Sequence, residues 1–317
     1  MKARAAEGAG AARRNRAAAI ALALMLTAAS IAAAPVSAID AFGNRIAFAA
    51  PAQRIVSLAP HATELLFAAG AGSHVVGVIA PADWPPEAAA VARVGDSRAL
   101  DLERIVALRP DLAVAWPYVA PAQIERLREL GIAIYLSDPH TPEAIADDLE
   151  RLGTLAGSSD IALREASAFR ARLAALRVRE RGASRVRVFY EIWHQPLYTI
   201  GGAHLISAAI ELCGGENVFG SLTLPAPSVS VEAVLAAAPE AIVAGTDGAV
   251  RPAWLGEWDA WQSIPAVARG NLFVVDANLL HRAGPRFIDG VEALCSTLDR
   301  ARINLGRQLG TKNRSSP

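Results

Sequence analysis

The chain has 317 residues, of which 53% are hydrophobic and 20% charged, and its formal net charge at pH 7 is zero. This length can bury a substantial core and favours two lobes over one compact domain. The neutral charge balance argues against nucleic-acid binding, which usually leaves a basic excess. After residue 40 no run of eighteen apolar residues occurs, so the mature part is not expected to span a membrane.

The N-terminus has the pattern of a secretory signal peptide. Three arginines between residues 13 and 16 precede an apolar run at 17–26, and small residues continue to Val36-Ser37-Ala38. We expect a signal peptide at residues 1–38, cleaved after Ala38, and a product in the periplasm. A membrane anchor is the alternative, disfavoured because the apolar run is short. No cysteine lies near the cleavage point, so a lipid anchor is not expected.

Short apolar runs then alternate with amphipathic stretches. The expected strands are 54–58, 75–79, 112–116 and 132–136, and the expected helices are 63–69 and 123–130. The glycines Gly70 and Gly131 end the two helices. Alternation of this kind predicts an α/β fold with a central parallel sheet flanked by helices.

Residues 142–181 lack any strand signal and are rich in Ala, Leu, Arg and Glu, which predicts a helical connector. A second alternating region follows, with expected strands at 185–190, 241–244 and 272–276 and expected helices at 203–212 and 288–305. We therefore expect four parts in the mature chain: an N-terminal lobe at 39–155, a linking helix at 156–182, a C-terminal lobe at 183–307, and a disordered polar tail at 308–317.

Two segments resemble each other. Residues 102–110 and 231–239 each form a short expected helix with a glutamate near its start, Glu103 or Glu232, and a proline seven positions later. An acidic residue and an apolar run follow each segment. Two related lobes are the arrangement that a clamshell binding protein requires, and chance similarity between Ala-rich helices is the alternative.

The sequence contains no recognisable catalytic or metal-binding motif. The six histidines are scattered, without an HExxH or CxxC motif, a G-x-S-x-G motif or a P-loop. We therefore expect no catalytic residues, no metal site and no cofactor.

Aromatic and polar residues instead follow the expected strands, where ligands of open α/β sheets bind. The candidates are Pro60, His61, Trp84, Trp116, Tyr118, Trp193, Asn278 and Arg282. Aromatic side chains bury much area at low entropic cost and suit a large flat ligand. Each also has a structural alternative, since Trp84 could cap a turn and Trp116 could belong to the core.

The mature part holds two cysteines, Cys213 and Cys295. In an oxidising compartment, two cysteines favour one disulfide, which would close a loop of about 80 residues and contribute roughly 4 kcal/mol. Two buried free thiols are the alternative.

Several motifs resemble a known family. Residues 54–60 with 63–65 resemble the opening of the iron-complex and cobalamin periplasmic binding proteins of ABC importers, and 40–51 is similar to their short N-terminal hairpin. Residues 102–116, 213–219 and 282–286 resemble the cobalamin-binding subgroup. The resemblance extends over nearly all of the mature chain.

This resemblance implies two α/β lobes joined by one long rigid helix, with cobalamin as the transported ligand in the cleft between them. It also implies a monomer that docks through Glu103 and Glu232 onto arginines of a permease dimer, whose ATPase subunits supply the energy. The subgroup's disulfide matches Cys213 and Cys295.

The chain departs from the subgroup at four places. Trp84 replaces a tyrosine, aromatic residues are missing near Ser97 and Ala226, and Asn278 replaces an aspartate. Other ligands therefore remain open. Haem would need an axial ligand such as Tyr118, His61 or His194, and a ferric siderophore would need several cationic side chains. A periplasmic enzyme on the same scaffold is a further alternative.

Overall fold

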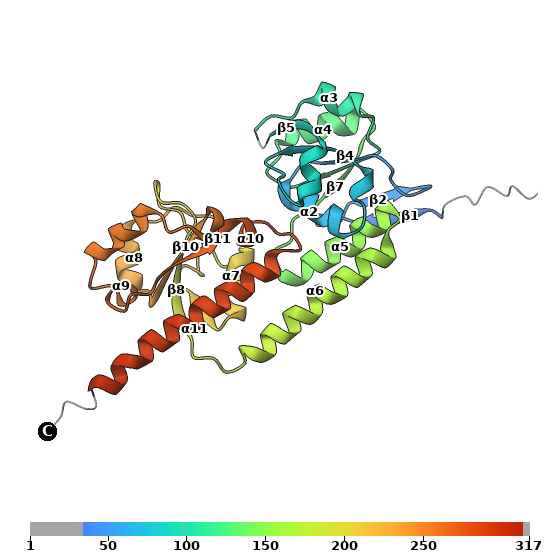
Figure 1. Cartoon of the computed structure of the whole chain (residues 1–317). Helices are drawn as coiled ribbons and strands as arrows, with labels where there is room; N and C mark the ends of the chain where they lie inside the picture. Colours follow the sequence, from blue (N-terminus) through green and yellow to red (C-terminus); the bar gives the residue numbers. More distant parts are fainter. Residues whose placement is uncertain (1–33, 97, 313–317) are drawn as a thin grey trace, which may run out of the picture.

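The computed structural model describes residues 34–96 and 98–312, with side chains through residue 307. Figure 1 shows two lobes connected by a long helical segment. Most of the expected signal peptide, residues 1–33, lies outside the described residues. Among the described residues, none of the helices qualifies as a candidate membrane span.

The N-terminal lobe is built on a five-stranded parallel sheet of order β5-β4-β3-β6-β7. Its strands are β3 (Ile55–Ser57), β4 (Val75–Ala80), β5 (Ala92–Asp96), β6 (Leu112–Ala115) and β7 (Ala133–Leu136). Successive side chains of a strand point to opposite faces. Leu112 and Val114 accordingly pack with helices α2 (Pro60–Ala68) and α5 (Pro142–Ala156). Ala113 packs on the other face, with α3 (Leu102–Ala107) and α4 (Pro121–Glu129).

The C-terminal lobe repeats this plan with a four-stranded parallel sheet of order β11-β10-β8-β9. Its strands are β8 (Val186–Glu191), β9 (Gly215–Asn217), β10 (Ala241–Thr246) and β11 (Leu272–Asp276). One face packs against α7 (Leu205–Leu212) and α11 (Phe287–Lys312). The other packs against α8 (Val231–Ala237), the 3-10 segment η4 (Ala253–Ala260) and α9 (Pro265–Ala268). The short helix α10 (Ala277–Leu280) follows β11. The expected two-lobed α/β architecture is confirmed.

Helices α5 and α6 (Ser159–Arg179) lie side by side, and α6 leads from the N-terminal lobe toward the C-terminal lobe (Figure 1). A Cβ atom on Gly153 of α5 would lie 2.2 Å from the Cβ of Ala162, so only glycine permits this close approach. One cluster of buried apolar side chains continues through both helices into each lobe, including Leu149, Phe169 and Leu294. The two lobes thus share part of one core.

A two-stranded antiparallel hairpin precedes the first lobe. Its strands are β1 (Val36–Ile39) and β2 (Arg45–Phe48), and the opposed residues Ala38 and Ile46 are buried. The expected cleavage after Ala38 would therefore remove three of the four residues of β1. The pattern Val36-Ser37-Ala38 satisfies the small-residue requirement of a cleavage site, but the same residues also suit a strand.

Cys213, at the end of α7, and Cys295, in α11, form a disulfide with a Cα–Cα distance of 4.7 Å. The bridge ties together two helices that cover the same face of the C-terminal sheet. The expected disulfide is confirmed, and the alternative of two free thiols is wrong.

Three elements differ from the sequence-based expectation. Strands β5 and β9 were not expected, because β5 has the sequence Ala-Arg-Val-Gly-Asp and β9 only three residues, neither forming an apolar run. Helix α11 continues to Lys312, beyond the tail start placed at residue 308. It passes through Gly306 because one glycine costs a helix only about 1 kcal/mol and no proline stops it. The rest of the expected tail lies outside the described residues.

Candidate functional site

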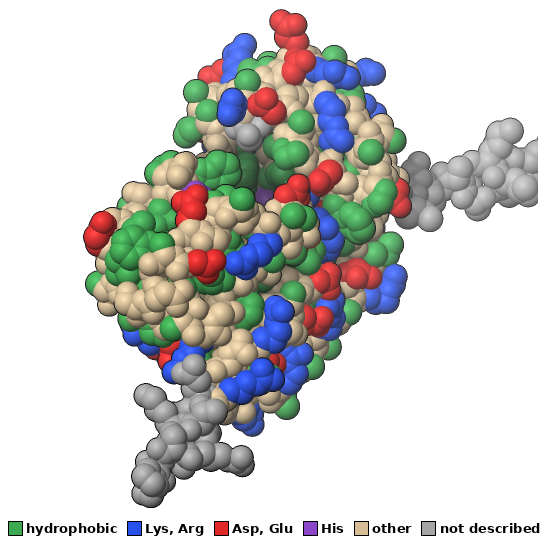
Figure 2. Space-filling view, turned by 60° about the vertical axis from the view of Figure 1, so that its left-hand side comes forward, with side chains coloured by type: hydrophobic (Ala, Val, Ile, Leu, Met, Phe, Trp, Pro, Cys, Tyr) green, Lys and Arg blue, Asp and Glu red, His purple; other side chains and the backbone are tan. Residues whose placement is uncertain are grey.

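The carboxyl ends of both sheets face a pocket between the lobes, which we call the interlobe pocket. The N-terminal lobe lines it with His61, Trp116, Tyr118 and residues 137–140, and the C-terminal lobe with His204 and His281 among others. Its cavity volume is about 90 Å³, smaller than a typical small-molecule site, so a large ligand also has to occupy the open surface beside it. Figure 2 shows histidine atoms in the hollow between the lobes.

Aromatic rings form the N-terminal wall of this pocket. The ring of Trp116 lies 5.6 Å from that of His61 and 4.9 Å, edge to face, from that of Tyr118. Tyr118 is 68% exposed, so its ring is available to a ligand. Stacked and edge-to-face aromatic groups are well suited to contact a large flat molecule.

A second hollow adjoins the interlobe pocket at His281, and we call it the tryptophan hollow. It is lined by Trp193, His194, Thr246, Val250 and Trp254, together with His281, and has a volume of about 670 Å³. Trp193 is 62% exposed, and the ring of His194 stacks on that of Trp254 at 4.8 Å. The two hollows together give the cleft space on both sides of His281.

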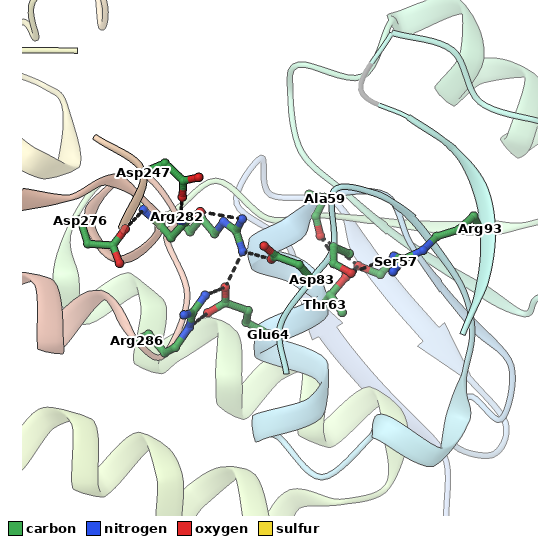
Figure 3. Close-up of polar contacts among 12 residues, drawn as sticks. Ser57, Ala59, Thr63, Glu64, Asp83, Arg93, Asp247, Asp276, Arg282 and Arg286 are labelled. Atoms are coloured by element: carbon green, nitrogen blue, oxygen red, sulfur yellow. Dashed lines mark hydrogen bonds and ion pairs between the residues drawn. The ribbon is translucent and has the colours of Figure 1, made fainter. Parts of the chain in front are cut away.

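A tight turn between β3 and α2 positions His61. The hydroxyls of Ser57 and Thr63 lie 2.8 Å apart, and both donate toward the carbonyl oxygen of Ala59 (Figure 3). This buried polar group fixes the first turn of α2, which begins at Pro60, where proline is well tolerated. His61 therefore faces the pocket from a rigid helix start, and Glu64 follows one turn later.

A buried carboxylate supports His61 from behind. The Tyr135 and Ser137 hydroxyls each donate to Asp148 at 2.6 Å, and His61 Nε2 lies 3.1 Å from the Ser137 Oγ. Burial raises the pKa of Asp148, and the hydrogen bonds from Ser137 and Tyr135 partly offset this. Burial also lowers the pKa of His61 to about 4, so its ring is neutral at pH 7.

Two further histidines of the interlobe pocket are neutral for the same reason. Burial, with the neighbouring His140, lowers the pKa of His204 to about 4. Burial, with the neighbouring His204, lowers the pKa of His281 to about 4, although Asp276 opposes the shift. The pocket thus presents uncharged nitrogen groups among aromatic rings at neutral pH.

Charged groups gather instead beside the pocket, in an ion-pair network between the lobes that we call the interlobe clasp (Figure 3). Its centre is Glu64 of α2, whose carboxylate is 2% exposed. Arg286 donates to Glu64 through Nε at 3.0 Å and Nη2 at 2.6 Å, and Arg282 donates to it at 3.3 Å. Arg282 also pairs with the exposed Asp83 and donates to Asn278 at 2.9 Å.

Three of the expected ligand-contact residues take part in the clasp or pack against it. Arg282 and Asn278 hydrogen-bond to each other, and the guanidinium of Arg286 lies over the Trp84 ring at 4.5 Å. Trp84 lines a separate hollow together with Glu64 and Arg286. The structure therefore brings His61, Trp116 and Tyr118 together, with Pro60 next to them on α2. Trp84, Asn278 and Arg282 lie in or against the clasp.

The two expected docking glutamates occupy equivalent, exposed places. Glu103 lies in the first turn of α3, where the Asp101 side chain caps the helix. Glu232 lies in the first turn of α8, where Ser230 is the cap. Hydrogen bonds from its own backbone N–H and from Ser230 lower the pKa of Glu232. Helices α3 and α8 lie at the outer ends of their lobes (Figure 1).

Sequence reasoning missed several site residues. The candidate ligand-contact residues did not include Glu64, Asp148, His204 or His281. Glu64 could have been suspected, because a glutamate in the apolar segment 62–69 has to find a partner when it is buried. His204 carried no comparable signal. Within the described residues, no group of three or more side chains could hold a metal ion.

Comparisons with known proteins agree with this geometry. A family model described as periplasmic binding protein matches residues 55–279. The vitamin B12-binding protein of Vibrio cholerae serotype O1 is 37% identical over 250 residues, covering 78% of this chain and 90% of that protein. The corresponding protein of Photorhabdus laumondii is 37% identical over 253 residues, covering 80% and 90%.

Solved structures of periplasmic binding proteins are also similar to this chain. The crystal structure of the periplasmic vitamin B12 binding protein BtuF of Vibrio cholerae matches with a TM-score of 0.73 and 36% identity, covering 80% of this chain and 98% of that one. A periplasmic heme binding protein from Pseudomonas aeruginosa matches with a TM-score of 0.65 and 26% identity, covering 77% and 92%.

The clasp predicts a large effect of removing the charge of Glu64. Glu64→Gln leaves Arg286 without a carboxylate partner in a site only 21% exposed, and should lower the free energy of unfolding by about 2–3 kcal/mol. Urea unfolding measures this loss, and small-angle X-ray scattering should detect wider separation of the lobes. The matched control is Asp83→Asn, because Asp83 is 62% exposed and should contribute under about 1 kcal/mol. Equal effects of the two variants would contradict a central role for Glu64.

Proposed function

The chain belongs to the periplasmic binding protein family, and from this membership we propose that it captures cobalamin, or a closely related corrinoid, between its lobes for delivery to an ABC importer. Members of this family bind rather than convert their ligands, so the chain is a binding protein and not an enzyme. Cobalamin is its cargo and not a cofactor. Its place of action is the periplasm.

The observation that carries the proposal is the aromatic-walled cleft, with neutral histidines, at the carboxyl ends of two facing sheets. A corrinoid is a broad, flat molecule whose rim carries uncharged carboxamides, and it matches such a lining. Pro60, His61, Trp116 and Tyr118 contact the ligand from the N-terminal lobe, and Trp193 contacts it from the tryptophan hollow. Trp84, Asn278 and Arg282 border the ligand at the clasp. The names of the relatives at 37% identity support the same ligand class.

The charges of the site disfavour the two alternative cargoes. Haem carries two carboxylates and a ferric siderophore is often anionic, so either would gain from free cations in the cleft. Arg282 and Arg286 are already paired with Glu64, and the neighbouring histidines are neutral. An uncharged corrinoid periphery needs no such cations.

The proposal predicts saturable binding of cyanocobalamin by the purified mature protein. Isothermal titration calorimetry should give one site per chain, and haemin and a ferric siderophore should bind at least tenfold more weakly.

Trp116→Ala should weaken the binding of cyanocobalamin at least tenfold, which is about 1.4 kcal/mol, because it removes the central ring of the N-terminal wall. Trp261→Ala, on an exposed tryptophan outside both hollows, is the matched control. Tighter binding of haemin than of cyanocobalamin would reject the corrinoid assignment.

We further propose that Glu103 and Glu232 dock the monomer onto arginines of a permease dimer that carries its ATPase subunits. The support is structural equivalence. Each glutamate lies in the first turn of a side-chain-capped helix, is exposed, and belongs to the unit repeated in the two lobes. Exposed acids at the two outer ends can meet two equivalent surfaces of a symmetric partner.

Charge reversal of both glutamates tests this docking. Glu103→Arg with Glu232→Arg should abolish corrinoid-dependent growth or uptake while the affinity of the purified protein for cyanocobalamin stays within twofold of wild type. The matched control reverses two other exposed acids, Glu129→Arg with Asp259→Arg, and should leave uptake intact. Normal uptake by the first double variant would refute the docking assignment.

Export through a cleavable signal peptide is also a proposal, and the hairpin refines its cleavage site. Ala38 is buried opposite Ile46, and Val36 pairs with Phe48. Removal of residues 1–38 would leave most of β2 without its partner strand. We therefore place the cleavage upstream of Val36.

Intact-mass analysis of the protein purified from the periplasm tests this revision. The mature N-terminus should lie at or before Val36. A variant that starts at Ile39 should be less stable than one that starts at Pro35, by urea unfolding, because it lacks most of β1. A mature chain that begins at Ile39 with undiminished stability would restore the original cleavage after Ala38.

A further inference from the structure

Four of the six histidines of the chain, His61, His140, His204 and His281, line the interlobe pocket. A neutral imidazole has one nitrogen that donates a hydrogen bond and one that accepts. Hydrogen bonds to the surrounding protein decide which nitrogen carries the proton. All four rings have such partners, and His140 lies at the exposed rim, so we assign the tautomers of the other three.

His61 presents an acceptor to the pocket. The single proton of the Ser137 hydroxyl goes to Asp148 at 2.6 Å, so the Ser137 Oγ must accept a hydrogen bond from His61 Nε2–H. The other ring nitrogen, Nδ1, is therefore unprotonated. It has no hydrogen-bond partner among the described residues and is not fully enclosed. Its lone pair is available to a ligand.

His204 presents a donor. The backbone N–H of Ile206 donates to His204 Nδ1 at 3.1 Å, so Nδ1 carries no proton. The proton of the neutral ring is on Nε2. This group has no partner among the described side chains and backbone groups, and His204 lines the pocket.

His281 also presents a donor. The hydroxyl of the fully buried Tyr190 lies 3.0 Å from His281 Nε2 and has no other partner within the described residues. A buried hydroxyl donates where it can, so Nε2 accepts and Nδ1 carries the proton. Gly245 makes room for this pair, because a Cβ there would lie 2.5 Å from His281 Nε2 and 2.7 Å from the Tyr190 hydroxyl.

We propose that these three histidines recognise the carboxamide groups of the ligand. His61 Nδ1 accepts from the amide N–H, and the N–H groups of His204 and His281 donate to the amide oxygen. The inference rests on the proposed function, since the rim of a corrinoid carries primary carboxamides that offer both kinds of group. A carboxylate has no N–H to donate to His61. Its oxygen would face the unprotonated Nδ1 of His61, so that two lone pairs repel each other.

The remaining titratable groups leave this pattern undisturbed. His140, at the exposed rim, pairs with Asp138 at 3.0 Å. Asp148 faces His61 only through Ser137, and Asp276 lies near His281 and Tyr190. The pKa values of about 4 for His61, His204 and His281 keep all three rings neutral from pH 8 down to about pH 5.5.

Modified corrinoids test the inference without altering the protein. Cyanocobalamin should bind wild-type protein at least tenfold more tightly than at least one of its monocarboxylic acid derivatives, in which a single carboxamide is replaced by a carboxylate. This preference should persist from pH 8 to pH 6. Below about pH 4.5 the affinity for cyanocobalamin should fall, since protonation of His61 removes its acceptor.

Protein variants then assign the preference to His61. In His61→Leu, the affinity for cyanocobalamin should exceed that for the monocarboxylic derivative by no more than about threefold, where the wild-type protein shows at least tenfold. His61→Gln restores a hydrogen-bond acceptor and should recover part of this preference. His74→Leu, on η1 (Gly72–His74) outside the pocket, is the control. If His61→Leu does not fold, Gly245→Ala, which displaces His281, serves as the second variant.

The outcomes separate the two proposals. Equal affinities of wild-type protein for cyanocobalamin and all its monocarboxylic derivatives, or an unchanged preference in His61→Leu, would overturn carboxamide recognition while leaving corrinoid capture intact. Failure of the wild-type protein to bind cyanocobalamin at all would overturn the proposed function itself, and this inference with it.

Discussion

The carboxylate of Glu64 is the constraint on which the arrangement of the lobes depends. It is almost completely removed from solvent, and its partners, Arg282 and Arg286, come from the other lobe. A buried carboxylate without these partners would be strongly destabilising, so the energy favours one spacing of the lobes. His61 lies one turn before Glu64 on the same helix. The contact that sets the spacing therefore also sets where His61 faces His204 and His281.

The same contact determines which polar groups remain free to contact a ligand in the cleft. Both arginines that approach it are paired with carboxylates in the clasp, and the pKa values of His204 and His281 are lowered to about 4, so both rings are neutral at pH 7. His194, in the tryptophan hollow, lies instead between Glu191 and Glu257. The interlobe pocket thus combines aromatic surface with neutral donors and acceptors. Such a lining selects for shape and for uncharged polar groups rather than for charge.

The parts of the structure that depend on local sequence patterns could be predicted from the sequence. Apolar runs located β3, β4, β6, β7, β8, β10 and β11, and the repeated helix–proline unit marked the two lobes. The structure extends that repeat. Arg109 and Ala238, just before the two prolines, both have positive φ, and the acids after them, Asp111 and Glu240, each accept N–H groups from the start of a neighbouring strand. The clasp could not be predicted in this way, because Glu64 and Arg286 are 222 residues apart and pair only after folding.

The repeat also connects the cleft to the proposed docking ends. In the first lobe, α3 carries Glu103, and β6 then runs through the core to Trp116 at the cleft. In the second lobe, α8 carries Glu232, and β10 runs to Thr246 at the tryptophan hollow. Each glutamate is thus joined to the cleft by one buried strand of a rigid sheet. Because the sheets cannot stretch, the spacing that the clasp imposes at the cleft also fixes the distance between the two glutamates. A ligand that changed the spacing of the lobes would therefore also change the distance between the two proposed docking residues.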